Sequence, residues 1–293
     1  NGVTLFGLGT ATIDLRISTA DFGPEYRTKL LARSTRMLGG GAAANALHQA
    51  ALLGAATEWL GRLGRDTIGR LITEDLRANG VGTAHAVLVD DALSPFNLAV
   101  YAGPANRRVG GFLLPNSLAD VTPSDLDLWA RAPRAGDLCL VEAGEILLPS
   151  VLEFCARLKG SAVRVLLDID LDPIVQCIGG STRLVAELLR SADYVLPNRD
   201  AMATLYPGLD ARELTRAIHA DCGRPVVTTA GSDGCYYTLA DGSVVHMAAP
   251  AVEVVDTVGA GDAFHGAFAW ALMNGRGLDD AVRAGSFCGA AAC

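Results

Sequence analysis

The sequence predicts an α/β fold in which a mainly parallel central sheet is covered by helices on both faces. Short β-branched runs alternate with helical stretches along most of the 293 residues, as in a parallel sheet built with crossover helices. Two glycine-rich turns, at residues 39–41 and 259–261, each run into an alanine-rich helix. Three further segments have strand-like patterning without crossover helices, which predicts a second, smaller sheet. No repeat or linker divides the chain, so we expect a single domain over residues 1–293.

The elements follow in order along the chain. We expect strands of the main sheet at residues 5–8, 138–142, 164–168, 194–197 and 225–229. We expect helices at residues 43–53, 68–79, 150–158, 184–191, 211–222, 263–274 and 278–292. The small sheet is predicted from residues 13–18, 31–38 and 96–113, with a hairpin turn at 104–107. Such a sheet has one apolar face to cover, either by closing on a ligand or by pairing with a second subunit.

The second glycine-rich turn is the most informative feature of the chain. Backbone N–H groups at the start of the following helix have no partner within the helix, and together with the positive end of its dipole they form a site for a phosphate or a developing oxyanion. Asp262 stands in the first turn, where a carboxylate can accept the proton of an attacking hydroxyl. The alternative is that Asp262 is only an acidic N-cap.

The first glycine-rich turn offers another site of close approach. It runs from Gly39 through Gly41 into a helix that carries Asn45. The amide of Asn45 both donates and accepts hydrogen bonds, which suits a sugar hydroxyl better than a phosphate. The alternative is that these glycines only allow tight helix packing.

Polar side chains also follow several predicted strands of the main sheet. Glu142, Asp168, Asp170 and Asn198 all stand at or just after the carboxyl ends of strands. Ligands of open α/β sheets bind at that edge. We therefore expect these side chains to gather around one site.

The composition excludes several classes of function. The net charge is −8, the pI is about 5.1 and no cluster of lysine or arginine occurs, which argues against nucleic acid as a partner. No apolar run reaches the roughly 18 residues of a membrane span, and no signal peptide is recognisable, so we expect a cytoplasmic protein without a membrane partner. The seven cysteines contain no Cys-x-x-Cys pair and indicate buried reduced thiols.

Two nucleotide-binding motifs are also absent. The segment from Gly7 to Thr12 starts like a dinucleotide fingerprint, but it lacks the third glycine and a following helix. No Gly-Lys-Ser/Thr sequence of a Walker-type P-loop occurs. The histidines show no metal-ligand spacing, and His265 is interpreted as lining a packed helix face.

Together, the two glycine-rich junctions resemble the PfkB (ribokinase-like) family of carbohydrate kinases over nearly the whole chain. The motif Asp-Thr-x-Gly-Ala-Gly-Asp at residues 256–262 is the most specific. Weaker similarities support it in the segments 7–14, 61–69, 168–173, 197–198 and 229–234. The resemblance implies a ribokinase-like three-layer α/β/α sandwich, with the small sheet as a lid over the sugar and as the contact surface of a homodimer. It also implies ATP and Mg²⁺ as cofactors, with K⁺ as a further ion.

The resemblance also assigns roles to individual residues. It implies Asp262 as the general base, with Gly259, Ala260 and Gly261 forming the anion hole. The sugar-binding residues would be Asp14, Gly40, Gly41, Asn45, Glu142, Asp168 and Asp170. The nucleotide-binding residues would be Asn198, Thr229, Gly231, Asp233, Gly234 and Ser286. Asp256 and the carbonyl of Val258 would hold the monovalent cation.

The chain departs from the family pattern at several positions. Family members carry a glutamate that organises Mg²⁺ where this chain has Ala201, and the neighbouring Asp200 lies about 100° away around a helix. Ala42 replaces a lysine that is frequent in the early motif. Relatives continue past the position of Cys293, and we expect a further tail here. These departures keep open a sensor that binds sugar or nucleotide without catalysis.

The sugar itself is also left open by the sequence. Fructokinase-like and ribokinase-like specificities lead, with nucleoside or 2-keto-3-deoxygluconate kinases of the same family as alternatives. An arginine typical of fructokinase and ketodeoxygluconate kinase relatives is replaced by Asp172, and its loss argues against an acid sugar.

Overall fold

The main sheet of the protein is parallel, as the alternating pattern predicts. The computed structural model describes residues 2–20, 22, 30–103, 107–113 and 120–293. Its seven-stranded sheet has the order β11-β10-β9-β1-β4-β5, with β6 also paired to β4, and all pairs are parallel. The strands are β1 (Thr4–Leu8), β4 (Ala56–Gly64), β5 (Val81–Gly82), β6 (Ala86–Val89), β9 (Leu138–Glu142), β10 (Arg164–Ile169) and β11 (Tyr194–Pro197).

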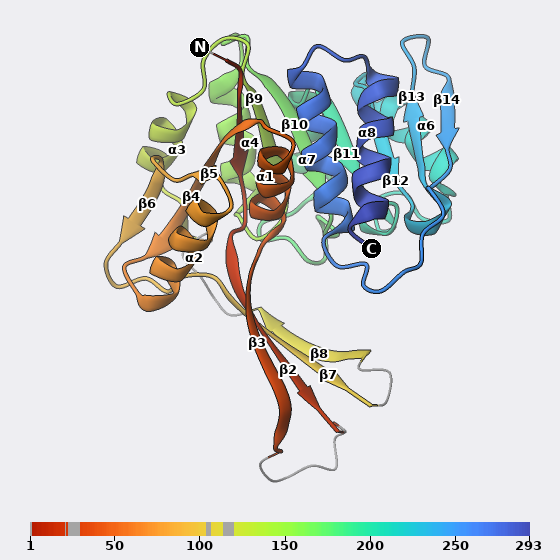
Figure 1. Ribbon diagram of the computed structural model, residues 1–293. Coiled ribbons are helices and arrows are strands. Elements are labelled where there is room, and N and C mark those ends of the chain that lie inside the picture. Colours follow the sequence, from red (N-terminus) through yellow and green to blue (C-terminus); the bar gives the residue numbers. More distant parts are fainter. Residues whose placement is uncertain (1, 21, 23–29, 104–106, 114–119) are drawn as a thin grey trace.

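Helices cover both faces of this sheet and make a three-layer sandwich (Figure 1). One hydrophobic core lies under α1 (Ala42–Leu52), α2 (Thr67–Ala78), α7 (Ala260–Met273) and α8 (Leu278–Ala291). The other lies under α3 (Pro123–Ala130), α4 (Leu148–Leu158), α5 (Thr182–Ser191) and α6 (Ala211–Cys222). In the part of the chain that the structure describes, no helix is both long and apolar enough to cross a membrane.

The C-terminal part of the sheet turns antiparallel. β12 (Val227–Thr229), β13 (Cys235–Thr238) and β14 (Val244–Met247) form a three-stranded antiparallel sheet. Isolated parallel bridges join Val195 to Val226 and Asn198 to Thr229, so this sheet continues the main one beyond β11. The strand expected at residues 225–229 is therefore confirmed in its place, but it pairs on its other side with an antiparallel neighbour.

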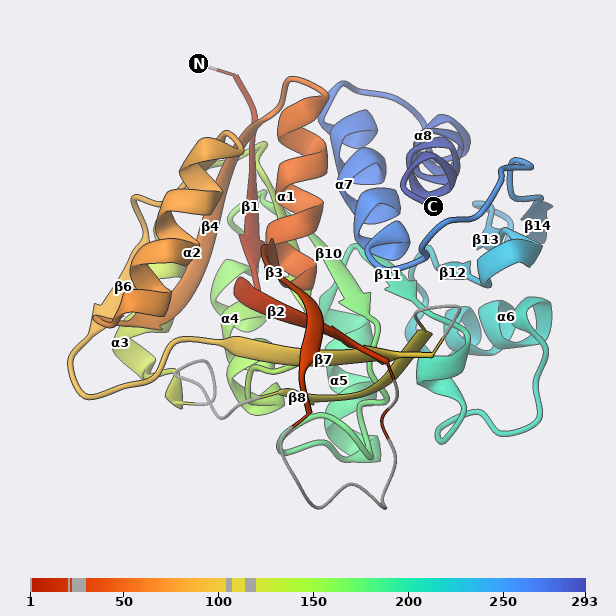
Figure 2. The same cartoon turned by 60° about the horizontal axis from the view of Figure 1, so that its bottom comes forward.

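The small sheet is confirmed and stands apart from the sandwich. It consists of β2 (Thr12–Thr19), β3 (Ala32–Gly40), β7 (Phe96–Ala102) and β8 (Arg107–Leu113), in the order β3-β2-β7-β8. β2 and β7 pair in parallel at its centre, and both outer pairs are antiparallel. It projects from the edge at which the main parallel strands end, and with that edge turned forward it lies across the front of the body (Figures 1 and 2). Most of the hairpin turn expected at 104–107 lies outside the described residues.

Close helix packing brings the two glycine-rich junctions together. A Cβ atom on Gly266 of α7 would lie 2.2 Å from the carbonyl oxygen of Ala46 on α1. Only glycine allows this approach of the two helix backbones. The start of α1 and the start of α7 are therefore neighbours at the lid edge of the sheet (Figure 2).

The segment 61–69 has a structural role. Asp66 caps α2, since its carboxylate accepts hydrogen bonds from Gly69 N at 2.7 Å and from Ser94 N at 2.9 Å. Gly64 lies so close to Ala92 that a Cβ would be 2.0 Å from its carbonyl oxygen. Asp66 and these glycines therefore connect β4, α2 and the chain that leads into the lid.

Candidate active site

Asn45 and Asp262 link the two glycine-rich junctions directly. Asn45 Nδ2 donates a hydrogen bond of 2.7 Å to Asp262 Oδ2, although the residues are 217 positions apart. Asp262 lies in the first turn of α7 and is 8% exposed. The bond is compatible with a role for Asn45 toward a sugar, but it first orients the carboxylate that the sequence predicts as the base.

The turn before α7 has the geometry of an anion site. Gly259 has a φ of 85°, which favours glycine, and its carbonyl accepts the first helical bond, from Ala263 N at 2.9 Å. Ala260 N donates a long bond of 3.3 Å to Thr257 O. The amides of Gly261 and Asp262 precede the first helical bond and are available to a ligand.

Burial and charge set the basicity of Asp262. Burial raises the pKa of its carboxyl to about 6; the Asn45 bond and the charge of His265 oppose this rise, and the charge of Asp168 adds to it. The group is thus ionised at neutral pH, while remaining a stronger base than an exposed aspartate. General bases are most effective with pKa values near the working pH.

Asp14 and the early glycines form a second part of the site. Asp14 Oδ1 accepts hydrogen bonds from Thr12 Oγ1 at 2.8 Å and from Asn97 Nδ2 at 3.0 Å. A Cβ on Gly40 would lie 2.9 Å from Asp14 Oδ2, and Gly41 has a φ of 97°. Glycine at position 40 keeps the backbone close to the Asp14 carboxylate, and glycine at position 41 keeps it close to the carbonyl of Thr10. Sequence reasoning missed Asn97, because its contact with Asp14 depends on the pairing of β7 with β2.

Glu142 supports the connection between β1 and the lid. Its carboxylate accepts bonds from Thr10 N at 2.7 Å and Thr10 Oγ1 at 2.8 Å, and the residue is 7% exposed. Burial raises the pKa of Glu142 to about 8, against the opposing effect of the bond from Thr10 N. The side chain expected to contact a sugar is thus largely occupied within the protein.

Asp168 contacts a residue that sequence reasoning placed in a packed helix face. His265 Nδ1 lies 3.0 Å from Asp168 Oδ2, with the two residues 0% and 1% exposed. Burial by itself would lower the pKa of His265, but the charges of Asp168, Asp170 and Asp262 outweigh it and raise the pKa. Burial, followed by the charge of Asp168, raises the pKa of Asp170. Asp168 has almost no surface open to a sugar, whereas Asp170 is partly exposed.

His265 could have been found from its spacing. It follows Asp262 by three positions on α7, and residues at that spacing share a helix face. The apolar character of the helix hid this signal, since most neighbours of His265 on α7 are buried apolar residues.

The residues expected to bind nucleotide gather beyond β11. Asn198 and Thr229 are joined by a parallel bridge, and the turn Gly231–Asp233 lies between β12 and β13. Gly234 closes this turn with a φ of 93°. Ser286 of α8 lies behind, with its Oγ 3.7 Å from Met247 Sδ. At the position of the missing glutamate, Ala201 is buried, and Asp200 pairs with Arg199 at 2.9 Å.

Asp256 and Val258 lie together, and the guanidinium of Arg16 in the lid pairs with Asp256. Asp256 Oδ1 accepts a bond from Val258 N at 3.1 Å, and Asp256 Oδ2 pairs with Arg16 Nη1 of β2 at 3.2 Å. The carbonyl of Cys293 accepts bonds from the amides of Val255 and Asp256. The arginine therefore occupies one oxygen of the carboxylate that was expected to hold a monovalent ion.

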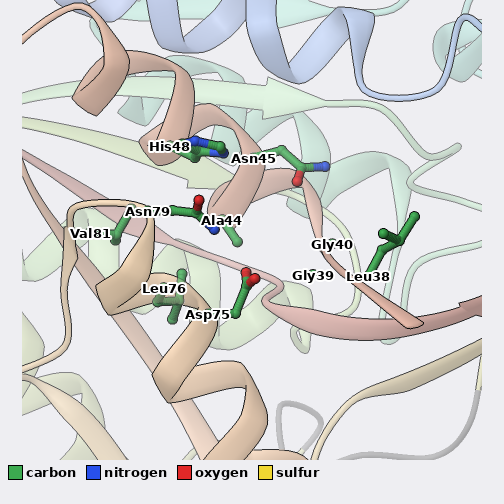
Figure 3. A pocket seen from close by; sticks show the side chains of 10 residues that line it. All are labelled: Leu38, Gly39, Gly40, Ala44, Asn45, His48, Asp75, Leu76, Asn79 and Val81. Atoms are coloured by element: carbon green, nitrogen blue, oxygen red, sulfur yellow. The ribbon is translucent and has the colours of Figure 1, made fainter. Parts of the chain in front are cut away.

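A pocket of about 230 Å³ lies behind the early glycines (Figure 3). Asn45 and His48 reach it from α1, Asp75 reaches it from α2, and Asn79 from the residue directly after α2. Its lining residues are Leu38, Gly39, Gly40, Ala44, Asn45, His48, Asp75, Leu76, Asn79 and Val81. The pocket shares Gly40 and Asn45 with the predicted sugar site, but the carboxylates of Asp14, Glu142 and Asp262 are not among its lining residues.

Known proteins resemble this chain along its whole length. The family profile of the pfkB family carbohydrate kinases matches residues 4–293. The ribokinase of Bacillus subtilis (strain 168) is 29% identical over 94% of this chain and 88% of its own. The structure of Arabidopsis thaliana ribokinase complexed with ribose and ATP superposes with a TM-score of 0.82 at 24% identity, covering 99% of this chain and 92% of that one. Phosphofructokinase-2 from Escherichia coli, in complex with potassium, gives 0.80 at 19% identity, with 99% and 92% covered.

Proposed function

This chain belongs to the PfkB family of carbohydrate kinases, ATP-dependent phosphotransferases with an alcohol group as acceptor, and we propose that its acceptor is the primary hydroxyl of a sugar. The observation that carries the proposal is the Asn45–Asp262 bond, which orients a buried carboxylate at the mouth of an anion-binding helix start. Ribokinase-like specificity is the first candidate, supported by the similarity to ribokinases, and fructokinase-like specificity is the second.

In the proposed mechanism, Asp262 is the general base. Its carboxylate takes the proton of the sugar hydroxyl as the oxygen attacks the γ-phosphorus of ATP, while the bond from that phosphorus to the β,γ-bridging oxygen breaks and ADP leaves. The bond from Asn45 occupies Oδ2 and leaves Oδ1 for the hydroxyl. Proton transfer of this kind typically contributes about 10²–10⁴ in rate.

The turn 259–261 would stabilise the charge of the transferred phosphoryl group. Phosphoryl transfer depends on alignment and on neutralising the charge spread over the equatorial oxygens. The amides of Gly261 and Asp262 and the positive end of α7 point to that role, with Gly259 and Ala260 shaping the turn. Mg²⁺ bound with ATP would supply further charge neutralisation at the phosphates.

The sugar would lie between the lid and the early glycines. Asp14 offers its Oδ2 to a hydroxyl while Oδ1 is held by Thr12 and Asn97. Gly40 and Gly41 let the sugar approach the backbone, and carboxylates bind hydroxyls well because each oxygen accepts several bonds. The surrounding carboxylates disfavour an anionic sugar, which supports a neutral substrate.

The adenosine part of ATP would lie between β11 and α8. This assignment is supported by the common location of Asn198, Thr229, Gly231, Gly234 and the turn that carries Asp233. Ser286 of α8 would form part of the wall of this adenosine site. A K⁺ ion near Asp256 and the Val258 carbonyl would require the Arg16 pair to open, and the potassium complex of phosphofructokinase-2 motivates a test for such an ion.

We also propose that residues 1–293 act as one kinase unit that dimerises through the lid. The lid exposes large apolar side chains on its outer strands, including Met37 at 52% and Phe112 at 62%. Exposed apolar surface on a four-stranded sheet is typical of an interface. Sedimentation of the protein and of the double variant Met37→Glu, Phe112→Glu would test this, and equal masses would contradict it.

A coupled ADP-release assay tests the function. The substrate panel comprises ribose, fructose, tagatose, 2-keto-3-deoxygluconate, inosine and adenosine. We expect a neutral sugar with a free primary hydroxyl to give the highest kcat/KM. Sugar-independent ADP release only, with measurable sugar binding by calorimetry, would instead support a sensor. Highest activity with a nucleoside would instead show that the protein is a nucleoside kinase of the family.

A further inference from the structure

A cluster of buried metal-ligating groups lies beside the anion-binding turn. It consists of Asp168 at the end of β10, Asp170 just after that strand, and His265 on α7. One ligand atom from each lies within 4.8 Å of the others. None of these side chains has a defined role in the proton-transfer step.

The cluster leaves polar atoms unsatisfied. Within the described part of the chain, Asp168 Oδ1 and both ring nitrogens of His265 have no hydrogen-bond partner, and these residues are 1% and 0% exposed. His265 Nδ1 and Asp168 Oδ2 are 3.0 Å apart, which is an ion-pair distance, but they are not aligned for a hydrogen bond. Buried polar groups are nearly always paired with protein, water or an ion. The unpaired atoms therefore point to a ligand.

We propose that Asp168, Asp170 and His265 bind one divalent transition-metal ion of the Mn²⁺ type. Ligand atoms on adjacent corners of an octahedron with bonds of about 2.1 Å are about 3.0 Å apart, and those on opposite corners about 4.2 Å. The 3.0 Å between His265 Nδ1 and Asp168 Oδ2 matches adjacent corners, and one ligand atom of Asp170 lies within 4.8 Å of both. One imidazole and two carboxylates suit Mn²⁺, Fe²⁺, Co²⁺ or Zn²⁺, whereas Mg²⁺ prefers oxygen ligands alone.

The surrounding charge favours a cation at this place. Asp168 and Asp170 lie close enough to Asp262 to interact electrostatically with it, and His265 is their shared neighbour. A divalent ion would offset the repulsion among these carboxylates. The Asp170 oxygens are 3.9 and 4.0 Å from the point where a Cβ on Gly261 would stand. The ion would thus lie next to the phosphoryl site.

The competing explanation is a buried ion pair between His265 and Asp168 that needs no metal. The two explanations differ in a measurable way, because only the metal site binds Mn²⁺ in the absence of nucleotide and sugar. This measurement is also independent of the proposed kinase substrate, since no turnover is involved.

The test is a titration of the EDTA-treated, dialysed protein with Mn²⁺. Calorimetry and the loss of the free Mn²⁺ signal in electron paramagnetic resonance should show one ion bound per chain. Electron spin echo modulation should show coupling to an imidazole ¹⁴N, which identifies His265 as a ligand. Mg²⁺ should compete only weakly.

Variants separate this site from other carboxylates. Asp170→Asn should weaken Mn²⁺ binding by at least about tenfold, and His265→Asn should remove the ¹⁴N coupling. Asp172→Asn is the matched control in the same loop, because the carboxylate of Asp172 accepts bonds from Ile174 N and Val175 N and lies outside the cluster. It should bind Mn²⁺ like the unchanged protein.

Three results would overturn the proposal: no Mn²⁺ bound by the unchanged protein, bound Mn²⁺ without ¹⁴N coupling, or equal affinity in the unchanged protein and Asp170→Asn. If the buried His265→Asn substitution prevents folding, the partly exposed Asp170 still allows the decision.

Discussion

The amide of Asn45 is hydrogen-bonded to the carboxylate of Asp262 at 2.7 Å, which joins the starts of two helices that are far apart in the chain. The contact exists because α1 and α7 pack closely at Gly266. Because the Asn45 amide contacts the predicted base Asp262, removing it should affect proton transfer and not only substrate binding.

Asn45→Ala should shift the pH dependence of the reaction. The hydrogen bond favours the ionised form of Asp262 and opposes the rise of its pKa, so its loss should raise that pKa further above about 6. The base works only when ionised, and the acidic limb of the kcat/KM profile should therefore move to higher pH. An unchanged limb, measured between pH 5 and 9, would show that Asn45 does not act through Asp262.

Asp262→Asn should lower kcat by about 10² or more, because general-base assistance is typically worth 10²–10⁴. The shape of the side chain is kept, so the Kd of the sugar should barely change. Near-normal turnover with the best substrate would mean that Asp262 is a helix cap and not the base.

Asp14→Ala should weaken sugar binding far more than ATP binding. A lost hydrogen bond to a charged group costs about 1.5–3 kcal/mol, which corresponds to roughly a tenfold to hundredfold higher Kd. Asp75→Ala is the matched control, because Asp75 contacts the neighbouring Gly39 from the pocket side. Calorimetry showing equal losses for both ligands would assign Asp14 a structural role.

Gly266→Ala should destabilise the protein and disturb the active site together. The added methyl group would lie 2.2 Å from Ala46 O, so α1 and α7 must separate, and overpacking of this kind typically costs about 1–3 kcal/mol. Both the midpoint of urea unfolding and kcat should fall. Gly277→Ala, where the added Cβ meets open space, should change both much less.

Asp66→Ala should cost about 1–2 kcal/mol of unfolding free energy at neutral pH through loss of the α2 cap. Burial alone would raise the pKa of Asp66, but the bonds from Gly69 and Ser94 outweigh it and lower the pKa below its ordinary 3.8. The contribution of the Asp66 cap to the unfolding free energy is thus complete above pH 3.8. It is lost as the pH falls through the lowered pKa of Asp66 in the folded protein.

Urea unfolding at a series of pH values measures this dependence. The difference between Asp66→Ala and the unchanged protein should shrink in strong acid. Asp66→Asn is the control, because asparagine also caps helices but does not titrate. A difference that stays constant down to the lowest pH would contradict the assignment.

The sequence determined the elements whose signals are local. The helix expected at residues 211–222 is α6 with the bounds Ala211–Cys222, and the strand expected at residues 138–142 is β9 with the bounds Leu138–Glu142. The sequence pattern does not predict α3, although Thr122 and Asp125 form a capping box at its start, because its apolar periodicity is short. The nine-residue strand β4 was missed because its glycines interrupt the apolar pattern.

The turn 259–261 and Asp262 are also local features, so residue type and spacing along the chain are enough to predict them. The tertiary structure decided which side chains meet. Asn45 reaches Asp262 only because Gly266 has no Cβ and lets the backbones of α1 and α7 come close. Asn97 reaches Asp14 only through strand pairing in the lid. His265 meets Asp168 through the tertiary fold as well, because no spacing along the chain specifies a contact between a helix and the end of a distant strand. Local sequence carries periodicity and turn chemistry, whereas contacts between distant segments depend on how the whole core packs.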